Sequence, residues 1–215
     1  MVARRVEGLP LEQVIGWAQF CGLRIAVEPG VFVPRRRTEF LVEQARSLAG
    51  PGDIIVDLCC GAGAIAAALA AAVPGAQVHA ADIDPVAVAC ARRNLPGHAV
   101  YQGDLFDPLP AALRGRVAVL TANVPYVPTS EIPLLPAEAR SHEPHTSLDG
   151  GLDGLEVLRR VAAAAPAWLA PGGHLLSETS DAQAPAAEAV FAAAGLAPRV
   201  VHSDDLYVTV IRGNA

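Results

Sequence analysis

A glycine-rich stretch with an acidic start carries the first groups that could bind a nucleotide-like ligand. Asp57 to Gly63 reads Asp-Leu-Cys-Cys-Gly-Ala-Gly and follows a short apolar, β-branched run. Glycines let a backbone approach a ligand closely, and free N–H groups at the start of a following helix would face it. A dinucleotide fits, because residues 61–66 match glycine, any, glycine, any, any, glycine or alanine. S-adenosylmethionine also fits, and the Asp57 carboxylate favours it because a carboxylate opposes a pyrophosphate and suits a cation.

Two further acids follow predicted strands. Asp82 ends the run 77–82, and strand tips in nucleotide-binding α/β folds carry a carboxylate that accepts both ribose hydroxyls. We predict that role for Asp82, because the alternative of a helix cap is better filled by Asp84, which precedes Pro85. Asp104 follows a third strand and could accept a hydrogen bond from an adenine amino group. A plain turn residue is the alternative for Asp104, and the sequence leaves both open.

The stretch Asn123-Val124-Pro125-Tyr126 could hold an amide or amino nitrogen. Such a nitrogen is a poor nucleophile that no ordinary side-chain base deprotonates, so geometry and electrostatics must activate it. The side-chain carbonyl of Asn123 and the main-chain carbonyl of Val124 could accept its two N–H bonds and aim its lone pair at a sulfonium methyl. Val124 precedes proline and is biased to extended geometry, and Tyr126 offers a planar face for stacking. An ordinary strand-ending turn is the alternative.

Strands and helices alternate along the chain and would position these residues. This alternation predicts an α/β fold in which helices sandwich a mostly parallel sheet. The proline-rich segment from Asn123 to Gly151 is predicted as a long loop, and 171–173 as a turn. The predicted strands are 17–20, 23–27, 53–58, 77–82, 99–101, 116–122, 174–178, 200–202 and 206–211, and the predicted helices are 38–48, 64–72, 85–95, 152–169 and 183–194.

Composition limits the function classes. The formal charge is −6 and all 16 basic residues are arginine, which argues against affinity gained by neutralising many phosphates. No apolar run is long enough for a membrane span and no signal segment opens the chain, so we expect a cytoplasmic protein. The four cysteines lack metal-site spacing. His142-Glu143-Pro144-His145 is a poor metal site because of its proline and loop setting, so no metal is predicted.

Two charged features have two readings each. The basic run Arg35-Arg36-Arg37 is interpreted as the solvated start of a helix, with a substrate-facing patch as the alternative. Glu178 ends a predicted strand and could assist a substrate or cap the next helix.

Taken together, these motifs resemble a known family, the release-factor glutamine methyltransferases (protein-glutamine N-methyltransferases of the HemK/PrmC type). The resemblance covers nearly the whole chain, and the combination is far more specific than any one motif. It is carried by Arg5 to Leu11, Phe20, Pro29 to Arg35 with Thr38-Glu39, Asp57 to Gly63, Asp82, Asn123 with Pro125-Tyr126, Glu143-Pro144 with Leu148, Gly150 to Leu155, and Glu178.

The resemblance implies a class I methyltransferase fold, a Rossmann-like seven-stranded sheet with an antiparallel last strand. It implies a hairpin and linker segment at 1–35 and a methyltransferase domain at 36–215. The implied reaction moves a methyl group from S-adenosylmethionine to a glutamine side-chain amide, usually in a translation release factor, and leaves S-adenosylhomocysteine. The implied catalytic residues are Asn123, Val124, Pro125 and Tyr126; the cofactor contacts are Asp57, Cys59, Gly61, Gly63, Asp82, Ile83, Asp104, Leu105 and Asn123; the substrate contacts are Phe32, Arg35, Tyr126 and Glu143.

The chain departs from the family pattern in three places. Val124 replaces the first of two usual prolines, which keeps the main-chain acceptor and loses a fixed φ. Arg36 stands where a proline is usual. The chain begins at the family's linker, so we expect the small N-terminal helical domain to be missing.

Other functions stay open on the sequence. An adenine N6-type nucleic-acid methyltransferase would use the same asparagine–proline–tyrosine logic, but the acidic charge and the lack of a recognition domain for flipped bases argue against it. A non-catalytic S-adenosylmethionine-binding module and a small-molecule methyltransferase are further alternatives.

Overall fold

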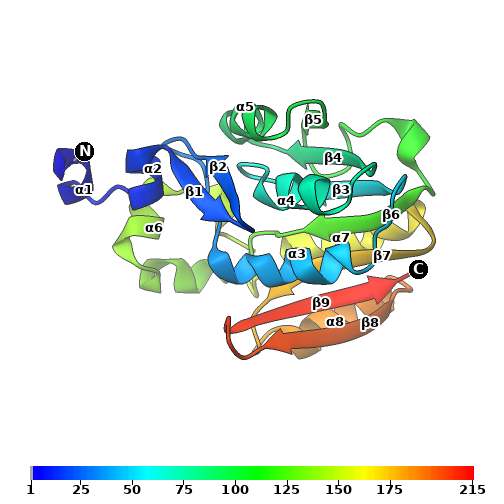
Figure 1. The fold of residues 1–215 in the computed structure, drawn as a ribbon. Coiled ribbons are helices and arrows are strands. Elements are labelled where there is room, and N and C mark those ends of the chain that lie inside the picture. Colours follow the sequence, from blue (N-terminus) through cyan, green and yellow to red (C-terminus); the bar gives the residue numbers. More distant parts are fainter. Residues whose placement is uncertain (1) are drawn as a thin grey trace.

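The computed structural model describes residues 2–215, and its centre is a seven-stranded sheet in the order β5-β4-β3-β6-β7-β9-β8 (Figure 1). Adjacent strands from β5 to β7 pair in parallel, whereas β9 is antiparallel to both of its neighbours. This confirms the predicted fold class. The strands are β3 (Ile54–Leu58), β4 (Gln77–Asp82), β5 (Ala99–Gln102), β6 (Val117–Ala122), β7 (Leu169–Thr179), β8 (Ala197–Ser203) and β9 (Val208–Asn214).

Helices cover both faces of the sheet. In Figure 1, α3 and α4 lie in front of it, and α7 and α8 lie behind. Side chains alternate along a strand, so Ile55 packs into the core with α3 and α4, while Ile54 and Val56 pack into the core with α7 and α8. All five residues of β3 are buried, as expected of a central parallel strand. The helices are α3 (Glu39–Arg46), α4 (Ala64–Ala72), α5 (Pro85–Asn94), α7 (Glu156–Ala164) and α8 (Ala184–Ala193).

The N-terminal segment folds against the main core. The hairpin of β1 (Trp17–Phe20) and β2 (Leu23–Ala26) buries Phe20 and Ile25 in the same cluster as α3 and α4. Two short helices that the sequence did not predict precede it, α1 (Val2–Val6) and α2 (Leu11–Ile15). The division into segments 1–35 and 36–215 stays a prediction, and Met1 lies outside the described residues.

Three sequence-based expectations differ from the structure. The predicted long loop after β6 contains α6 (Ala137–His142) and two 3-10 turns, η3 (Thr129–Leu134) and η4 (His145–Ser147). The predicted turn at 171–173 is wrong, because β7 runs through it. Between the pairs Val117–Leu169 and Val119–His174, β7 has four residues where β6 has one, so the strand continues past three extra residues. Helix α7 begins later than predicted, because Gly151 and Gly154 adopt positive φ angles that a right-handed helix excludes.

The carboxyl ends of the parallel strands face the side on which the hairpin, α2 and α6 gather, at the left of Figure 1. Ligands of open α/β sheets bind beyond these strand ends. Within the described residues, no helix is long and apolar enough to cross a membrane.

Candidate active site

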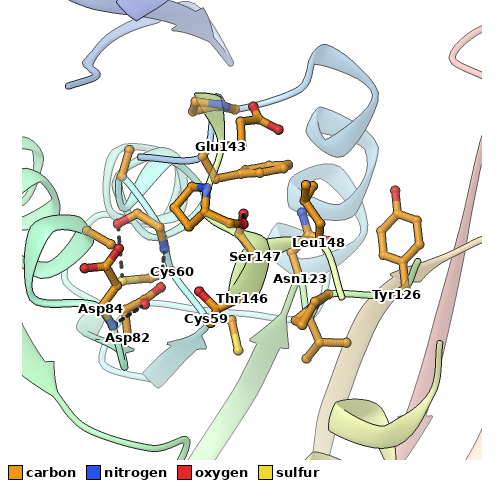
Figure 2. A pocket seen from close by; sticks show the side chains of 18 of the residues that line it. Cys59, Cys60, Asp82, Asp84, Asn123, Tyr126, Glu143, Thr146, Ser147 and Leu148 are labelled. Carbon is orange, nitrogen blue, oxygen red and sulfur yellow. Dashed lines mark hydrogen bonds between the residues drawn. The ribbon is translucent and has the colours of Figure 1, made fainter. Parts of the chain in front are cut away.

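A cavity of about 710 Å³ opens at the carboxyl ends of β3, β4 and β6. Figure 2 shows Asp82 and Asp84 at one end, Tyr126 at the other and Asn123 between them. The predicted site residues that line this cavity are Phe32, Arg35, Cys59, Gly61, Asp82, Ile83, Asp104, Leu105, Asn123, Val124, Pro125, Tyr126 and Glu143.

The glycine-rich turn is tied to the tip of β4. The Gly61 N–H donates to Asp82 Oδ2 at 2.8 Å, and the Asp84 N–H donates to Asp82 Oδ1 at 2.9 Å. Gly61 has a φ of +53°, and a Cβ there would meet only Phe32 Cβ at 4.0 Å. The backbone at Gly61 is therefore open to a ligand. Burial raises the pKa of Asp82, and the two donated N–H bonds oppose that rise.

Two predicted cofactor contacts, Asp57 and Gly63, do not line the cavity. Asp57 is fully buried, accepts the Thr121 hydroxyl at 2.8 Å and accepts the N–H of Ala66 in the first turn of α4 at 3.2 Å. It therefore caps a helix whose N-cap residue, Gly63, has no side chain. A Cβ on Gly63 would lie 3.0 Å from Ala91 and from Leu95, so this glycine is needed for helix packing.

The predicted adenine-side carboxylate has a partner. Asp104 Oδ2 accepts a hydrogen bond from Arg160 Nη2 at 2.5 Å, and both residues line the cavity. Nothing in the sequence marked Arg160, which lies on α7 far along the chain. Ile83 leaves 58% of its surface exposed on the cavity, as expected of a wall that awaits an apolar ligand face. Burial raises the pKa of the Cys59 thiol, so Cys59 is a neutral wall residue.

The middle of the cavity holds an unpaired acceptor. Asn123 Oδ1 is buried and has no hydrogen-bond partner within residues 2–215. Val124 is 2% exposed and lines the same cavity. Its carbonyl oxygen accepts no hydrogen bond from residues 2–215. A buried acceptor without a partner costs free energy. Both oxygens therefore lack an N–H partner, and because Asn123 Oδ1 is closed off from solvent, its side-chain amide must turn towards the cavity to accept a hydrogen bond from a ligand.

The Tyr126 hydroxyl is held by an ion pair. Arg37 Nη2 donates to the Tyr126 oxygen at 2.7 Å, and Tyr126 donates to Glu178 Oε1 at 3.0 Å. Arg37 Nε also donates to Glu178 Oε1 at 2.8 Å, and Thr38 donates to Glu178 Oε2 at 2.6 Å. Burial, followed by the Glu178 charge, raises the pKa of Tyr126 to about 12, so its hydroxyl stays protonated. Glu178 caps no helix, because α8 begins after Gln183 and has no side-chain cap.

A second ion pair joins the linker after β2 to the helical segment after β6. Arg35 Nη2 donates to both carboxylate oxygens of Glu143 at 2.7 Å, and the Val33 N–H donates to Glu143 Oε1 at 3.2 Å. Arg35 also lies 4.8 Å from the ring centre of Phe32. The interpretation of Arg35 to Arg37 as a solvated helix start is therefore wrong for Arg35 and Arg37, because both line the cavity and pair with buried carboxylates.

A glycine turn supports the Asn123–Tyr126 stretch from behind. A Cβ on Gly150 would lie 2.7 Å from Pro125 O, and one on Gly154 would lie 2.3 Å from Tyr126 O. Gln183 Nε2 donates to the same Tyr126 oxygen at 2.9 Å. Close backbone contact explains why glycine is needed at both positions.

These residues fit S-adenosylmethionine. The Asp82, Asp84 and Asp104 carboxylates line the end at which Gly61 is open, and carboxylates suit ribose hydroxyls and a cationic ligand. The unpaired Asn123 oxygen lies further along the cavity, where an acceptor molecule would meet the cofactor.

Comparison with known proteins decides the family. A release factor glutamine methyltransferase of Geobacter sulfurreducens is 39% identical to this chain, covering 91% of it and 69% of the relative. One from Streptomyces coelicolor is 41% identical, covering 85% of this chain and 67% of the relative. The chain belongs to the release factor glutamine methyltransferase family. Residues 22–127 also match the Methyltransferase small domain.

A solved structure agrees with this family. The protein-(glutamine-N5) methyltransferase (release factor-specific) of Alicyclobacillus acidocaldarius superposes with a TM-score of 0.52 and 26% identity, covering 87% of this chain and 97% of that one. These comparisons confirm three predictions: the methyltransferase fold, the enzyme class of protein-glutamine methyltransferase, and S-adenosylmethionine as the cofactor. The roles of individual residues in this family member stay predictions.

Proposed function

We propose that this chain methylates the side-chain amide nitrogen of a glutamine that a translation release factor exposes. The observation that carries the proposal is the buried, unpartnered Oδ1 of Asn123 in the wall of the cavity. The names of the relatives support a release factor as the protein substrate. Because release factors act in translation, we also propose that the enzyme works in the cytoplasm.

Asn123 and Val124 would clasp the amide. A glutamine NH₂ group has two N–H donors, and the Asn123 side-chain oxygen and the Val124 main-chain oxygen are two free acceptors beside each other in the sequence. Two accepted hydrogen bonds would fix the amide plane and draw electron density towards nitrogen. Because no side-chain base removes an amide proton before attack, orientation and electrostatics would provide the activation, and the methylated nitrogen would lose one proton to water after transfer.

Residues at the acidic end would hold the cofactor. In this proposal Asp82 accepts from the ribose hydroxyls, Asp104 accepts from the adenine amino group, and Cys59, Ile83 and Leu105 form the walls. The bound cofactor supplies an electrophilic methyl group on a sulfonium. Gly61 leaves room for its close approach, since no Cβ occupies that side of the turn.

The acceptor end would receive the glutamine side chain between flat and apolar groups. Phe32 and Tyr126 would form its walls, and the Arg35–Glu143 pair would frame its mouth. A protein side chain can reach this end only if it protrudes, which favours a glutamine in an exposed loop.

The test is transfer of labelled methyl to purified release factors and to nucleic acids offered in parallel. We expect label on a release-factor glutamine, located by mass spectrometry. The rate of methyl transfer should fall about a thousandfold in Asn123→Ala. Asn214→Ala changes the same residue type at an exposed strand end and should retain activity. Cofactor affinity of Asn123→Ala, measured by calorimetry, should stay within a few fold.

Label on nucleic acid alone would replace this function by a nucleic-acid methyltransferase. Cofactor binding with no transfer to any acceptor would leave a non-catalytic binding module. Full activity of Asn123→Ala would reject the proposed clasp.

A further inference from the structure

The Tyr126 side chain is the end of a network that joins segments far apart in the chain. Arg37 and Thr38 precede α3, whereas Glu178 lies near the end of β7. Glu178 is 2% exposed, and its carboxylate accepts hydrogen bonds from Arg37, Thr38 and Tyr126. A carboxylate so deeply buried needs such partners. These partners come from the segment before α3 and from the segment after β6.

The Tyr126 hydroxyl has little capacity left for a substrate. It accepts from Arg37 Nη2 and donates its single proton to Glu178. The main-chain end of the same residue is held by Gln183 and is packed against Gly154. Tyr126 is therefore fixed at both ends, while its ring borders the cavity. What it can offer an incoming amide is a wall in a set orientation.

We propose that Arg37, Glu178 and Thr38 are positioning residues that hold the Tyr126 ring beside the amide-binding slot. The inference deepens the proposed function and rests on it. The network acts through Tyr126, so it sets where the glutamine amide lies relative to Asn123. Misplacing a reacting group by a fraction of an ångström is enough to slow a reaction that depends on orientation.

A purely structural ion pair would also hold α3 against β7, so the two roles must be separated. A pair that only stabilises the fold changes the stability of the protein independently of the Tyr126 hydroxyl. A pair that works through that hydroxyl loses its effect on transfer once the hydroxyl is gone. Energetic coupling between two groups of one network reports this difference.

The experiment is a double-mutant cycle of Tyr126→Phe and Arg37→Lys, read by methyl transfer to a release factor. Arg37→Lys keeps a charge beside Glu178, so the fold is retained, but one ammonium cannot reproduce the guanidinium fork. We expect each single change to lower kcat about tenfold and the double change to lower it at most about twofold further. The KM for the release factor and the cofactor affinity should stay within about twofold. Arg36→Lys, on the exposed neighbour, should match the wild type.

Losses that multiply to about a hundredfold in the double variant would overturn the inference. The inference would also be overturned if the loss of kcat across the variants correlated with their melting temperatures and not with the presence of the Tyr126 hydroxyl. Tyr126→Phe with unchanged kcat would overturn it as well.

A second measurement does not depend on activity. NMR of protein labelled at tyrosine Cζ, in mixed H₂O and D₂O, reports hydroxyl exchange at each of the three tyrosines. We expect Tyr126 to exchange far more slowly than Tyr207, which is 91% exposed, and Arg37→Lys to speed that exchange. Equal exchange at the two hydroxyls would overturn the inference. If the wild type methylates no acceptor, the proposed function fails, and hydroxyl exchange still decides whether the network holds Tyr126.

Discussion

The two ends of the cavity are built in different ways. The cofactor end uses a turn after β3 and the tip of the neighbouring strand β4, and the bond from Gly61 N–H to Asp82 spans only 21 residues. The amide end uses side chains from segments much further apart, because Arg37 and Glu178 are separated by 141 residues and Arg35 and Glu143 by 108. Backbone groups thus hold the glycine turn at the cofactor end, where the Asp104–Arg160 pair spans 56 residues, and ion pairs that span more than 100 residues hold the amide end.

This difference means that the two ends should fail separately. The glycine-rich turn after β3 lies close in sequence to β4, so its bond to Asp82 needs only β3 and β4 to pair. A side-chain network forms only when α3, β6 and β7 have all assembled. Substitutions at one end should therefore change cofactor binding, and those at the other should change transfer with little effect on the cofactor.

At the amide end, the largest effect of a glycine substitution on stability is expected for Gly154→Ala. Its Cβ would lie 2.3 Å from Tyr126 O and from Gln183 Nε2, at a φ of +75°. We expect a loss of about 3 kcal/mol in unfolding free energy and at least tenfold slower transfer, with cofactor affinity little changed. Chemical denaturation and label transfer measure both.

Gly115→Ala is the control for that substitution, because Gly115 has a φ of +68° and open space around it. Strain alone should cost about 1 kcal/mol there, without an effect on transfer. Equal losses in the two variants would show that contact with Tyr126 does not matter.

At the cofactor end, Asp82→Asn should weaken S-adenosylmethionine binding by about 10- to 100-fold. An amide has one acceptor where the carboxylate has two, and both carboxylate oxygens of Asp82 already accept backbone N–H groups. Calorimetry measures the affinity, and Asp107→Asn removes the same charge from an exposed site outside the cavity. Unchanged affinity in Asp82→Asn would contradict the ribose role.

A pH effect is expected at Asp57, behind the cofactor end, and it is small over any single pH unit. Burial raises the pKa of Asp57 from 3.8 to about 7 in the folded protein. The folded state then holds a proton that the unfolded state has lost, so Asp57 stabilises the fold fully below about pH 4 and loses that contribution as the pH rises through 7. Between pH 6 and 7 the loss is about 1 kcal/mol.

Asp57→Asn should remove this pH dependence. Its amide can donate to Thr121 and accept from the Ala66 N–H, which replaces the bonds that Asp57 makes. Unfolding free energies measured in urea from pH 5 to 8 should diverge between the two proteins as the pH rises. Parallel curves would place the Asp57 pKa near its ordinary value.

The backbone elements were predictable because each is encoded locally. The alanine run 64–72 and the strand 77–82 have the predicted bounds, since helix propensity and the turn signals that flank a strand act over a few residues. The short helices after β6 were missed, because proline marks the segment as irregular without saying where the next turn begins. The strand β7 was predicted too short, because its bulge depends on the register against β6.

Sequence alone determined the parts of this protein that short stretches of chain encode: the alternation of strands and helices, the open glycine turn, the acid that ends β4 and the asparagine after β6. Only the tertiary structure decided that Asp57 faces α4 instead of the cavity, that Arg37 meets Glu178 and Tyr126, and that Glu143 meets Arg35. The physical reason is range. Backbone conformation follows from neighbouring residues, whereas a buried charge finds its partner only where folding brings distant segments together.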